Sequence, residues 1–572
     1  MQINKQSNFI IIITLVLFNL IIYFNGINND FVWDDTYLIR DNLIIRDISN
    51  FNKLMSKEDK PDDFAGRGYF RPFINLTYLV DYKIFNNAPA GYRLTNIALH
   101  ISTVIIMFFL LLLITENTLL SFSAALIFSA QAVHAEAVTL LHGRNNVICA
   151  LFILLSLLFY VLSDKMKNKK YLIHSMIFLF LGAISKEFAL MLPIIFILYD
   201  HTFDEQFTIK KHYKKYITSF AVIFLFFVYR TLAVPMEGAF RLNLPTLYLR
   251  LINMLRVHVS YMRSQIIPDN LSIYFDLPLA KSIFAPEIFV SLITISAIIF
   301  LVIYFRKKDK VPYFALFTYF LLLVPVSHIF EIPGNMMADR WLYPASFAFA
   351  LFLASLIFHL FSKNIRYATV FIIIFSIFLS FFLLKRNKAL KNDFTFYLDT
   401  VRVSPNSALA RNNLGNELDK RGRFDKALEQ YLMAIELNPD YNLPYNNIGV
   451  IYGRKKEHKK ALKFFLKSYE LNPLYSVTPF NIAVTYDDLG KIEEAIKHYK
   501  IAISLNPEDF NSYYSLAAAY YRLKDYKSAL DILEDARKIA YDDARKSEIE
   551  KKIKMMKVRL DRQIAAESAT TK

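Results

Sequence analysis

Apolar runs of membrane-spanning length fill the first part of this 572-residue chain and stop near residue 385. A helix needs roughly 20 apolar residues to cross about 30 Å of hydrocarbon. Such runs occur at about 8–25, 94–113, 119–134, 147–163, 170–185, 187–201, 216–234, 286–305, 311–330, 342–361 and 367–384. We therefore expect an all-α membrane domain over 1–384 with about eleven spans, of which the third, fifth and sixth are short.

The composition excludes several classes of protein. The chain is 55% hydrophobic and 20% charged, with 52 Phe, which excludes a disordered or collagen-like chain. A single Cys excludes an internal disulfide framework. The formal net charge is +17, but up to residue 384 there are 33 Lys and Arg against 24 Asp and Glu, and after it 34 against 26. Because neither part is a basic domain, we expect no nucleic acid partner.

Short basic loops orient the predicted spans, because cytoplasmic loops carry an excess of Lys and Arg. Basic clusters lie within 165–170, 210–215, 306–310 and 363–366, after the fourth, sixth, eighth and tenth spans. With eleven spans, all four clusters fall on the cytoplasmic side, and the part after residue 385 lies outside the cytoplasm. We expect a multi-pass protein of the bacterial inner membrane, which the rich Ile, Lys and Asn usage favours. The alternative is the ER membrane with a lumenal C-terminal part.

The C-terminal part repeats with a period of 34 residues. The residues that recur are Pro405, Pro439, Pro473 and Pro507; Gly415, Gly449, Ala483 and Ala517; and Ala427, Ala461, Ala495 and Ala529. Small residues let two helices approach closely, and Pro ends the second helix of each pair. The pattern resembles the tetratricopeptide repeat (TPR), an α-solenoid. It predicts a linker over 385–407, four repeats over 408–543, and a capping helix and tail over 544–572.

An amide recurs within this period at Asn413, Asn447 and Asn481 and becomes Ser515 in the last copy. The spacing places these side chains on the inner face of the superhelix, where amides can hydrogen-bond the backbone of an extended acceptor peptide. Helix capping or hydrogen bonding between repeats explains the same pattern. Both interpretations stay open at this point.

Polar motifs of the membrane domain fall at the external face on the predicted topology. A carboxylate pair, Asp34 and Asp35, follows the first span, and acidic groups so close to a membrane are costly unless they are hydrated, paired or used. The other motifs are Tyr69-Phe70-Arg71-Pro72-Phe73, Gly91-Tyr92-Arg93-Leu94-Thr95-Asn96, His134-Ala135-Glu136, His142-Gly143-Arg144, Lys186-Glu187 and Asp339-Arg340-Trp341-Leu342-Tyr343-Pro344. Carboxylates and cations that converge at one face favour an enzyme over a non-catalytic scaffold.

The ordered combination of these motifs with a trailing TPR array resembles the transmembrane and TPR repeat-containing protein O-mannosyltransferase family. That family belongs to the GT-C superfamily of multispanning glycosyltransferases. The resemblance covers nearly the whole chain and implies transfer of a sugar from a polyprenyl-phosphate donor in the membrane to Ser or Thr of extracytoplasmic proteins. Mannose as the donor sugar rests wholly on this resemblance.

Such a transfer needs a base for the acceptor hydroxyl and cations for the departing phosphate. By similarity to the acidic motif of the family, Asp35 is the preferred base and Asp34 supports it, and a single displacement inverts the anomeric centre. Lys186, Arg340 and Arg71 are candidates for the phosphate, because guanidinium groups suit its oxygens. The remaining catalytic candidate, Glu187, orients the acceptor or pairs with Lys186. For each cation, an interfacial salt bridge or a lipid-headgroup contact is the alternative.

Two further questions stay open in the sequence. The spacing of His134, Glu136 and His142 matches no standard set of metal ligands, so we expect no metal there; whether a divalent cation binds beside Asp34 and Asp35 is undecided. The second question is the class of function. A ligase or polymerase of lipid-linked oligosaccharide, and a membrane scaffold whose repeats collect partners, are the two alternatives to protein glycosylation.

Overall fold

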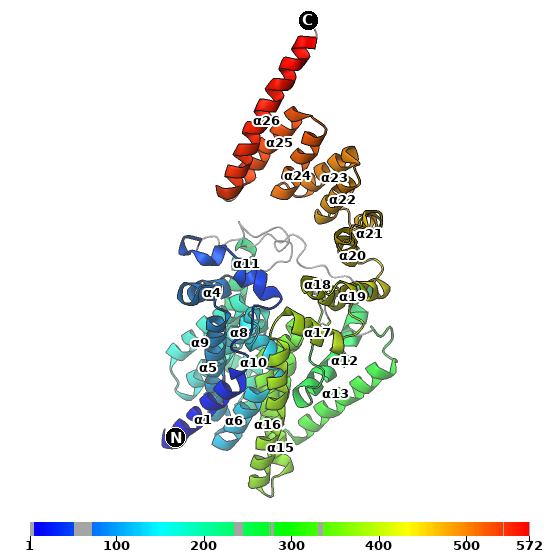
Figure 1. Cartoon of the computed structure of the whole chain (residues 1–572). Helices are drawn as coiled ribbons and strands as arrows, with labels where there is room; N and C mark the ends of the chain where they lie inside the picture. The colour runs from blue at the N-terminus through cyan, green and yellow to red at the C-terminus, as the bar shows by residue number, and fades with distance from the viewer. Residues whose placement is uncertain are drawn as a thin grey trace. The chain divides into compact units, whose positions relative to one another are not determined.

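The computed structural model describes residues 5–50, 71–233, 244–273, 275, 279–329, 336–540 and 543–570. Every regular element in these ranges is a helix, which confirms the predicted all-α class. The chain divides into two compact units, Met1–Ser404 and Pro405–Lys572. Figure 1 shows the helices of both units.

Helices of widely different length build the first unit, which we call the membrane domain. They are α1 (Lys5–Phe24), α4 (Pro72–Phe85), α5 (Pro89–Thr115), α6 (Thr118–Ala130), α7 (Ala135–Val138), α8 (Arg144–Lys165), α9 (Lys169–Ser185), α10 (Leu192–Phe203), α11 (Ile209–Ala233), α12 (Leu244–Ile266), α13 (Pro286–Phe305), α14 (Val311–Leu323), α15 (Tyr343–Leu360), α16 (Ile365–Ala389) and α17 (Asp393–Val403). Short helical turns lie between them, among them η5 (Leu141–Gly143), η6 (Glu187–Met191) and η8 (Asp339–Trp341).

Among the described residues, six helices are long and apolar enough to cross a membrane: Pro89–Thr115, Leu141–Lys165, Ile209–Ala233, Pro286–Tyr304, Tyr343–Leu360 and Ile365–Ala389. The pair Thr118–Ala130 and Ala132–Val138, bent by 54°, adds a seventh if it is one span. Shorter apolar helices are Asn8–Phe24 and Val311–Val326. The unit is thus a membrane domain, while the predicted number of eleven spans stays a prediction.

Helix direction brings the polar motifs to one end of this domain. The helices α8 and α9 pack on each other and are joined by a short basic loop, so the start of α8 at Arg144 and the end of α9 at Ser185 lie at the same end. The start of α15 and the end of α16 are related in the same way by the loop between them. The basic loops after α8 and α15 therefore lie at the other end of their helices, in the pattern that the sequence predicts.

The membrane domain extends beyond the boundary predicted from the sequence. The stretch 385–407, predicted as a linker, is helical over most of its length, because α16 continues to Ala389 and α17 follows at Asp393–Val403. The N-terminus of α17 is a capping box, in which Asn392 and Thr395 satisfy each other's backbone N–H groups. The division between the units falls after Ser404.

The second unit consists of helix pairs in the predicted 34-residue period. Its helices are α18 (Ala408–Lys420), α19 (Phe424–Leu437), α20 (Asn442–Arg454), α21 (His458–Leu471), α22 (Val477–Asp488), α23 (Ile492–Leu505), α24 (Phe510–Arg522), α25 (Tyr526–Ile539) and α26 (Asp543–Thr570). A side chain at Gly415 would come within 2.5 Å of the Tyr431 ring, and one at Gly449 within 2.6 Å of the Phe465 ring. These contacts explain why small residues recur where paired helices meet.

Candidate active site

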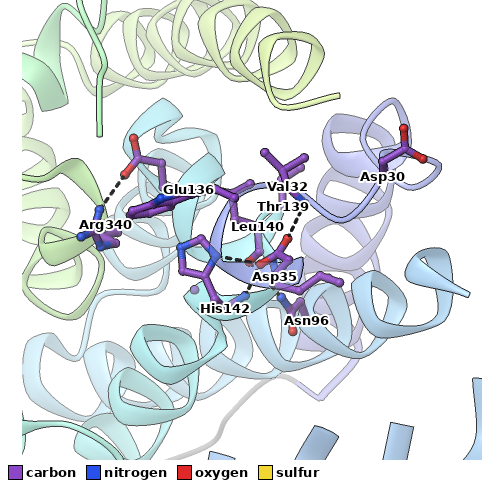
Figure 2. Close-up of polar contacts among 12 residues, drawn as sticks. Asp30, Val32, Asp35, Asn96, Glu136, Thr139, Leu140, His142 and Arg340 are labelled. Carbon is purple, nitrogen blue, oxygen red and sulfur yellow. Dashed lines mark hydrogen bonds and ion pairs between the residues drawn. The ribbon is translucent and has the colours of Figure 1, made fainter. Parts of the chain in front are cut away.

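The carboxylate of Asp35 is fully buried and holds the loop after α1 against η5, which leads into α8 (Figure 2). Its Oδ1 accepts from the backbone N–H of His142 at 2.8 Å and from the His142 Nδ1 at 2.7 Å. Its Oδ2 accepts from the backbone N–H groups of Leu141 and Val32 at 3.2 and 3.3 Å. Both oxygens of Asp35 thus accept from N–H groups and are shielded from solvent, and these hydrogen bonds anchor the loop.

His142 receives its orientation from this contact. Its Nδ1 is held by the carboxylate, and its Nε2 has no hydrogen-bond partner among the described residues. The next residue, Gly143, permits the close approach of η5 to α7: a side chain there would lie 2.3 Å from the Glu136 carbonyl oxygen. The sequence His142-Gly143-Arg144 is thus a tightly packed connection.

Two arginines from the predicted motifs are fully buried and bind other parts of the protein. Arg93 donates to the backbone carbonyls of Asn29, Asp30 and Thr139 and so fixes the loop before the acidic pair. Arg144 donates to Asn96 at 2.6 Å, to Thr77 at 3.1 Å and to the carboxylate of Asp81, which is itself buried. We call Arg93 and Arg144 the anchor arginines, because their hydrogen bonds all go to the fold.

A second buried network joins the ends of α7, α16 and α17. Glu136 accepts from Arg386 at 2.9 Å, and Arg386 also donates to Asp399 of α17 at 2.6 Å. On its other side, Glu136 lies 3.9 Å from Arg340, the contact drawn in Figure 2. Arg340 therefore lies beside a buried carboxylate, and its guanidinium also lies 5.3 Å from the centre of the Trp33 ring.

Three basic side chains and one carboxylate line a small, partly open cavity between α9, η6 and α11. Arg71, Lys186, Glu187 and Arg230 line it together with Phe226 and Tyr229 of α11. Glu187 lies 3.4 Å from Arg230 and 4.0 Å from Arg71, so one carboxylate is shared by two guanidinium groups. We call this the cation-lined cavity.

Lys186 lies in the connection between α9 and η6, outside the spanning helices, and donates to Asn146 of α8. Burial lowers the pKa of its ammonium well below the usual range, and the positive charge of Arg71 lowers that pKa further, with Arg340 acting in the same direction. Two of the cations that the sequence proposed for phosphate are thus close enough to Lys186 to disfavour its charge. An anion in the cavity would reverse this effect.

The structure separates the predicted catalytic residues by their surroundings. Asp35 is buried, whereas the neighbouring Asp34 is partly exposed. Glu187, the third candidate, has a side chain that is 42% exposed at the cavity. Arg230 was missed by sequence reasoning, because it lies in the last turn of an apolar helix and reads as the flank of a span.

Metal-compatible groups lie elsewhere in the described residues. A set of three such side chains, Asp164, Asp200 and His212, lies at the far end of α8. Each already has partners: Asp200 accepts from two tyrosines, Asp164 pairs with a lysine, and His212 pairs with Asp204. The carboxylate of Asp35 offers no oxygen that is not already hydrogen-bonded by N–H groups.

In the repeats, the amide ladder makes hydrogen bonds between neighbouring repeats. The Nδ2 of Asn447 donates to Asn412 at 3.0 Å and to Asn416 at 2.9 Å, and the Nδ2 of Asn481 donates to Asn446 at 2.9 Å. The Oδ1 of Asn413 accepts from Asn412 at 3.3 Å. These contacts match the second interpretation of the ladder, and its role in acceptor binding stays a proposal.

The chain is similar over most of its length to protein O-mannosyl-transferases. One relative, "Protein O-mannosyl-transferase F38B6.6" of Caenorhabditis elegans, is 26% identical over 73% of this chain and 61% of its own length. Mouse and human "Protein O-mannosyl-transferase TMTC3" are each 23% identical over 72% of this chain and 49% of their own length. The chain thus spans between about half and three-fifths of the length of these relatives.

Comparisons of the C-terminal unit identify its repeats. The family described as "TPR repeat" matches residues 415–456 and 485–524, and two described as "Tetratricopeptide repeat" match 444–473 and 511–540. Solved structures include "Crystal structure of MamA protein", 21% identical over 26% of this chain and 80% of that one, with a TM-score of 0.24. The chain is therefore similar over most of its length to protein O-mannosyl-transferases, and it carries tetratricopeptide repeats in its C-terminal unit.

Proposed function

We propose that this protein transfers a mannosyl group from a polyprenyl-phosphate donor to Ser or Thr hydroxyls of extracytoplasmic proteins, as an inverting enzyme of the GT-C type. The similarity to protein O-mannosyl-transferases supports the reaction class. The observation that carries the proposal is the cation-lined cavity at the polar end of the membrane domain. A scaffold would not need to gather three cations around one partly exposed carboxylate.

The cavity suits the phosphate of a lipid donor. The guanidinium groups of Arg71 and Arg230 already exceed the single negative charge of Glu187, so a bound phosphate gains charge-assisted hydrogen bonds. Its negative charge would also favour the charged form of Lys186. The spanning part of α11 is largely exposed on the surface of the unit, and Phe226 and Tyr229 of the same helix line the cavity. In the proposed complex, the polyprenyl chain follows this apolar helix and the phosphate lies among the cations.

We assign the base to Asp34 and a positioning role to Asp35, which exchanges the roles favoured by the sequence. Asp35 is occupied by four N–H groups, whereas Asp34 is partly exposed and adjacent to it. In the proposed step, the carboxylate of Asp34 takes the hydroxyl proton of Ser or Thr while the hydroxyl oxygen bonds to the anomeric carbon. The bond from that carbon to the phosphate oxygen breaks, and the negative charge of the leaving phosphate is stabilised by the cations.

The remaining assignments concern acceptor and compartment. We propose that the repeats recruit the acceptor protein, with Asn413, Asn447 and Asn481 on the face that meets it. We also propose a bacterial inner membrane as the location, with the polar end of the membrane domain and the repeats outside the cytoplasm. Protease treatment of sealed vesicles tests this, since cleavage of the repeats from the cytoplasmic side would contradict it.

A transfer assay with reconstituted full-length protein tests the function. Labelled polyprenyl-phosphate mannose and a Ser/Thr-rich peptide should give O-mannosylated peptide, with an anomeric configuration opposite to that of the donor by NMR. Formation of labelled glycan without labelled peptide would instead support an oligosaccharide ligase. Binding of acceptor proteins without any transfer, across several lipid-phosphate sugars, would support a scaffold.

A further inference from the structure

The backbone of Trp33, directly before the acidic pair, adopts a left-handed conformation with φ of 55°. A bulky side chain rarely takes this conformation, because its Cβ crowds the backbone. A strained backbone conformation of this kind is kept only where contacts with the surrounding structure enforce it, and such residues concentrate at functional sites. Trp33 therefore needs contacts that hold it in place.

Helix α17 supplies those contacts. The backbone N–H of Trp33 donates to the Asp393 Oδ1 at 2.7 Å, and its indole stacks on Phe396, with 6.2 Å between ring centres. The turn that leads into α17 binds the same loop, since the N–H of Asp30 donates to the carbonyl of Lys391 at 2.9 Å. About 360 residues separate these partners in the chain.

The other faces of the Trp33 ring meet the candidate active site. Its edge packs on His142, the partner of Asp35, with 5.1 Å between ring centres. The Arg340 guanidinium lies 5.3 Å from the same ring centre. One side chain thus lies against α17, against His142, which is hydrogen-bonded to Asp35, and beside one of the predicted phosphate-binding cations.

We propose that α17 is a clamp that holds Trp33 in its left-handed conformation, and that Trp33 is thereby the positioning residue of Asp34 and Asp35. The clamp rests on the proposed transfer activity. Since the two carboxylates follow Trp33 directly, a relaxed Trp33 backbone redirects both. Loss of the clamp therefore lowers the rate of the chemical step and leaves donor binding in the cation-lined cavity intact.

Substitutions at Asp393 separate this role from a general structural one. Asp393→Ala removes the acceptor of the Trp33 N–H, while the capping box of Asn392 and Thr395 still begins α17. Asp393→Asn keeps an oxygen at the same place. We expect kcat to fall about 10- to 100-fold in D393A with the donor KM unchanged, because displacement by about 1 Å is enough for such a loss. We expect D393N to restore most of it.

Hydrogen exchange gives a readout that does not depend on activity. In the full-length protein, D393A should speed amide exchange in the segment 30–41 and leave the protection of α5, α8 and the repeats unchanged, while D393N should resemble wild type. Arg402→Ala is the matched control on α17. The Arg402 side chain pairs with Asp399 but is 57% exposed, so its loss should disturb α17 little. It should change neither exchange nor kcat.

The outcomes distinguish the two proposals. Unchanged exchange in segment 30–41 of D393A, or faster exchange there with wild-type kcat, would overturn the clamp while the transferase proposal stands. A wild-type protein that transfers no sugar would contradict the proposed function, and unchanged exchange in D393A would then contradict the clamp as well. If kcat falls equally in D393A and D393N, the activity depends on the charge of Asp393 and not on its hydrogen bond to Trp33. That result would also overturn the clamp.

Discussion

The anchor arginines and the cation-lined cavity lie at the same end of the membrane domain, yet their partners differ. Arg144 is fully buried and donates its hydrogen bonds to side chains and a backbone carbonyl of the same domain. Arg71 and Arg230 are partly exposed at a cavity, where they share the carboxylate of Glu187. Residues of one chemical type at one end of the domain thus have different surroundings, and burial tells them apart.

The largest expected effect concerns the anchor arginines and falls on stability. Arg144→Ala leaves the buried carboxylate of Asp81 without its cation, which typically costs about 3–5 kcal/mol. We expect a large fall of the apparent melting temperature in detergent and a low yield of folded protein. Arg71→Ala is the matched variant, and it should melt close to wild type. Equal melting temperatures of R144A and R71A would contradict the distinction between the anchor arginines and the cations of the cavity.

The next effect falls on rate and tests the acidic pair. Asp34→Asn removes the proposed base, so kcat should fall about 10²- to 10³-fold while the melting temperature stays near that of wild type. Asp35→Asn should instead lower stability, because an amide at this position can no longer accept from all four N–H groups with the strength of a carboxylate. A stable but inactive D35N together with an active D34N would return the base to Asp35.

The sequence predicts the fold well, because its two signals are local. Apolar runs and a 34-residue period are properties of neighbouring or regularly spaced residues, and both reappear as helices at the predicted places. The sequence puts the end of the membrane domain near residue 385, whereas the structure divides the two units after Ser404. The 19 residues from 385 to 403 are polar enough to resemble a linker. Only contacts with residues near 30, far away in sequence, show that α17 packs against the loop after α1.

The sequence predicts which residues make up the candidate site, but not what each of them does. The motifs name Asp34, Asp35, Lys186 and Arg340, yet adjacent carboxylates look alike in a sequence, and burial alone separates Asp35 from Asp34. Arg230 carries no motif, and its place beside Glu187 depends on how α11 packs near α9. Roles set by partners distant in the chain require the fold.

A smaller effect is expected at Arg230, on donor binding. Arg230→Ala removes one charge-assisted contact to the proposed phosphate, worth about 1.5–3 kcal/mol, so the donor KM should rise about 10-fold or more with kcat less affected. The control is Arg306→Ala, which removes a cation at the other end of the domain, beside His201. It should leave the donor KM unchanged. An equal rise in both variants would mean that overall charge, rather than the cavity, attracts the donor.

The smallest expected effect concerns the amide ladder of the repeats. It separates acceptor binding from hydrogen bonding between repeats. Asn447→Ala removes two hydrogen bonds between repeats, so we expect a stability loss of about 1–2 kcal/mol by denaturant unfolding of the full-length protein. Asn413 makes one longer contact, so Asn413→Ala should unfold near wild type. If the ladder also binds acceptor, N413A raises the acceptor KM a few-fold without loss of stability. If N413A keeps the wild-type acceptor KM and N447A changes stability alone, the ladder joins the repeats and the acceptor binds elsewhere.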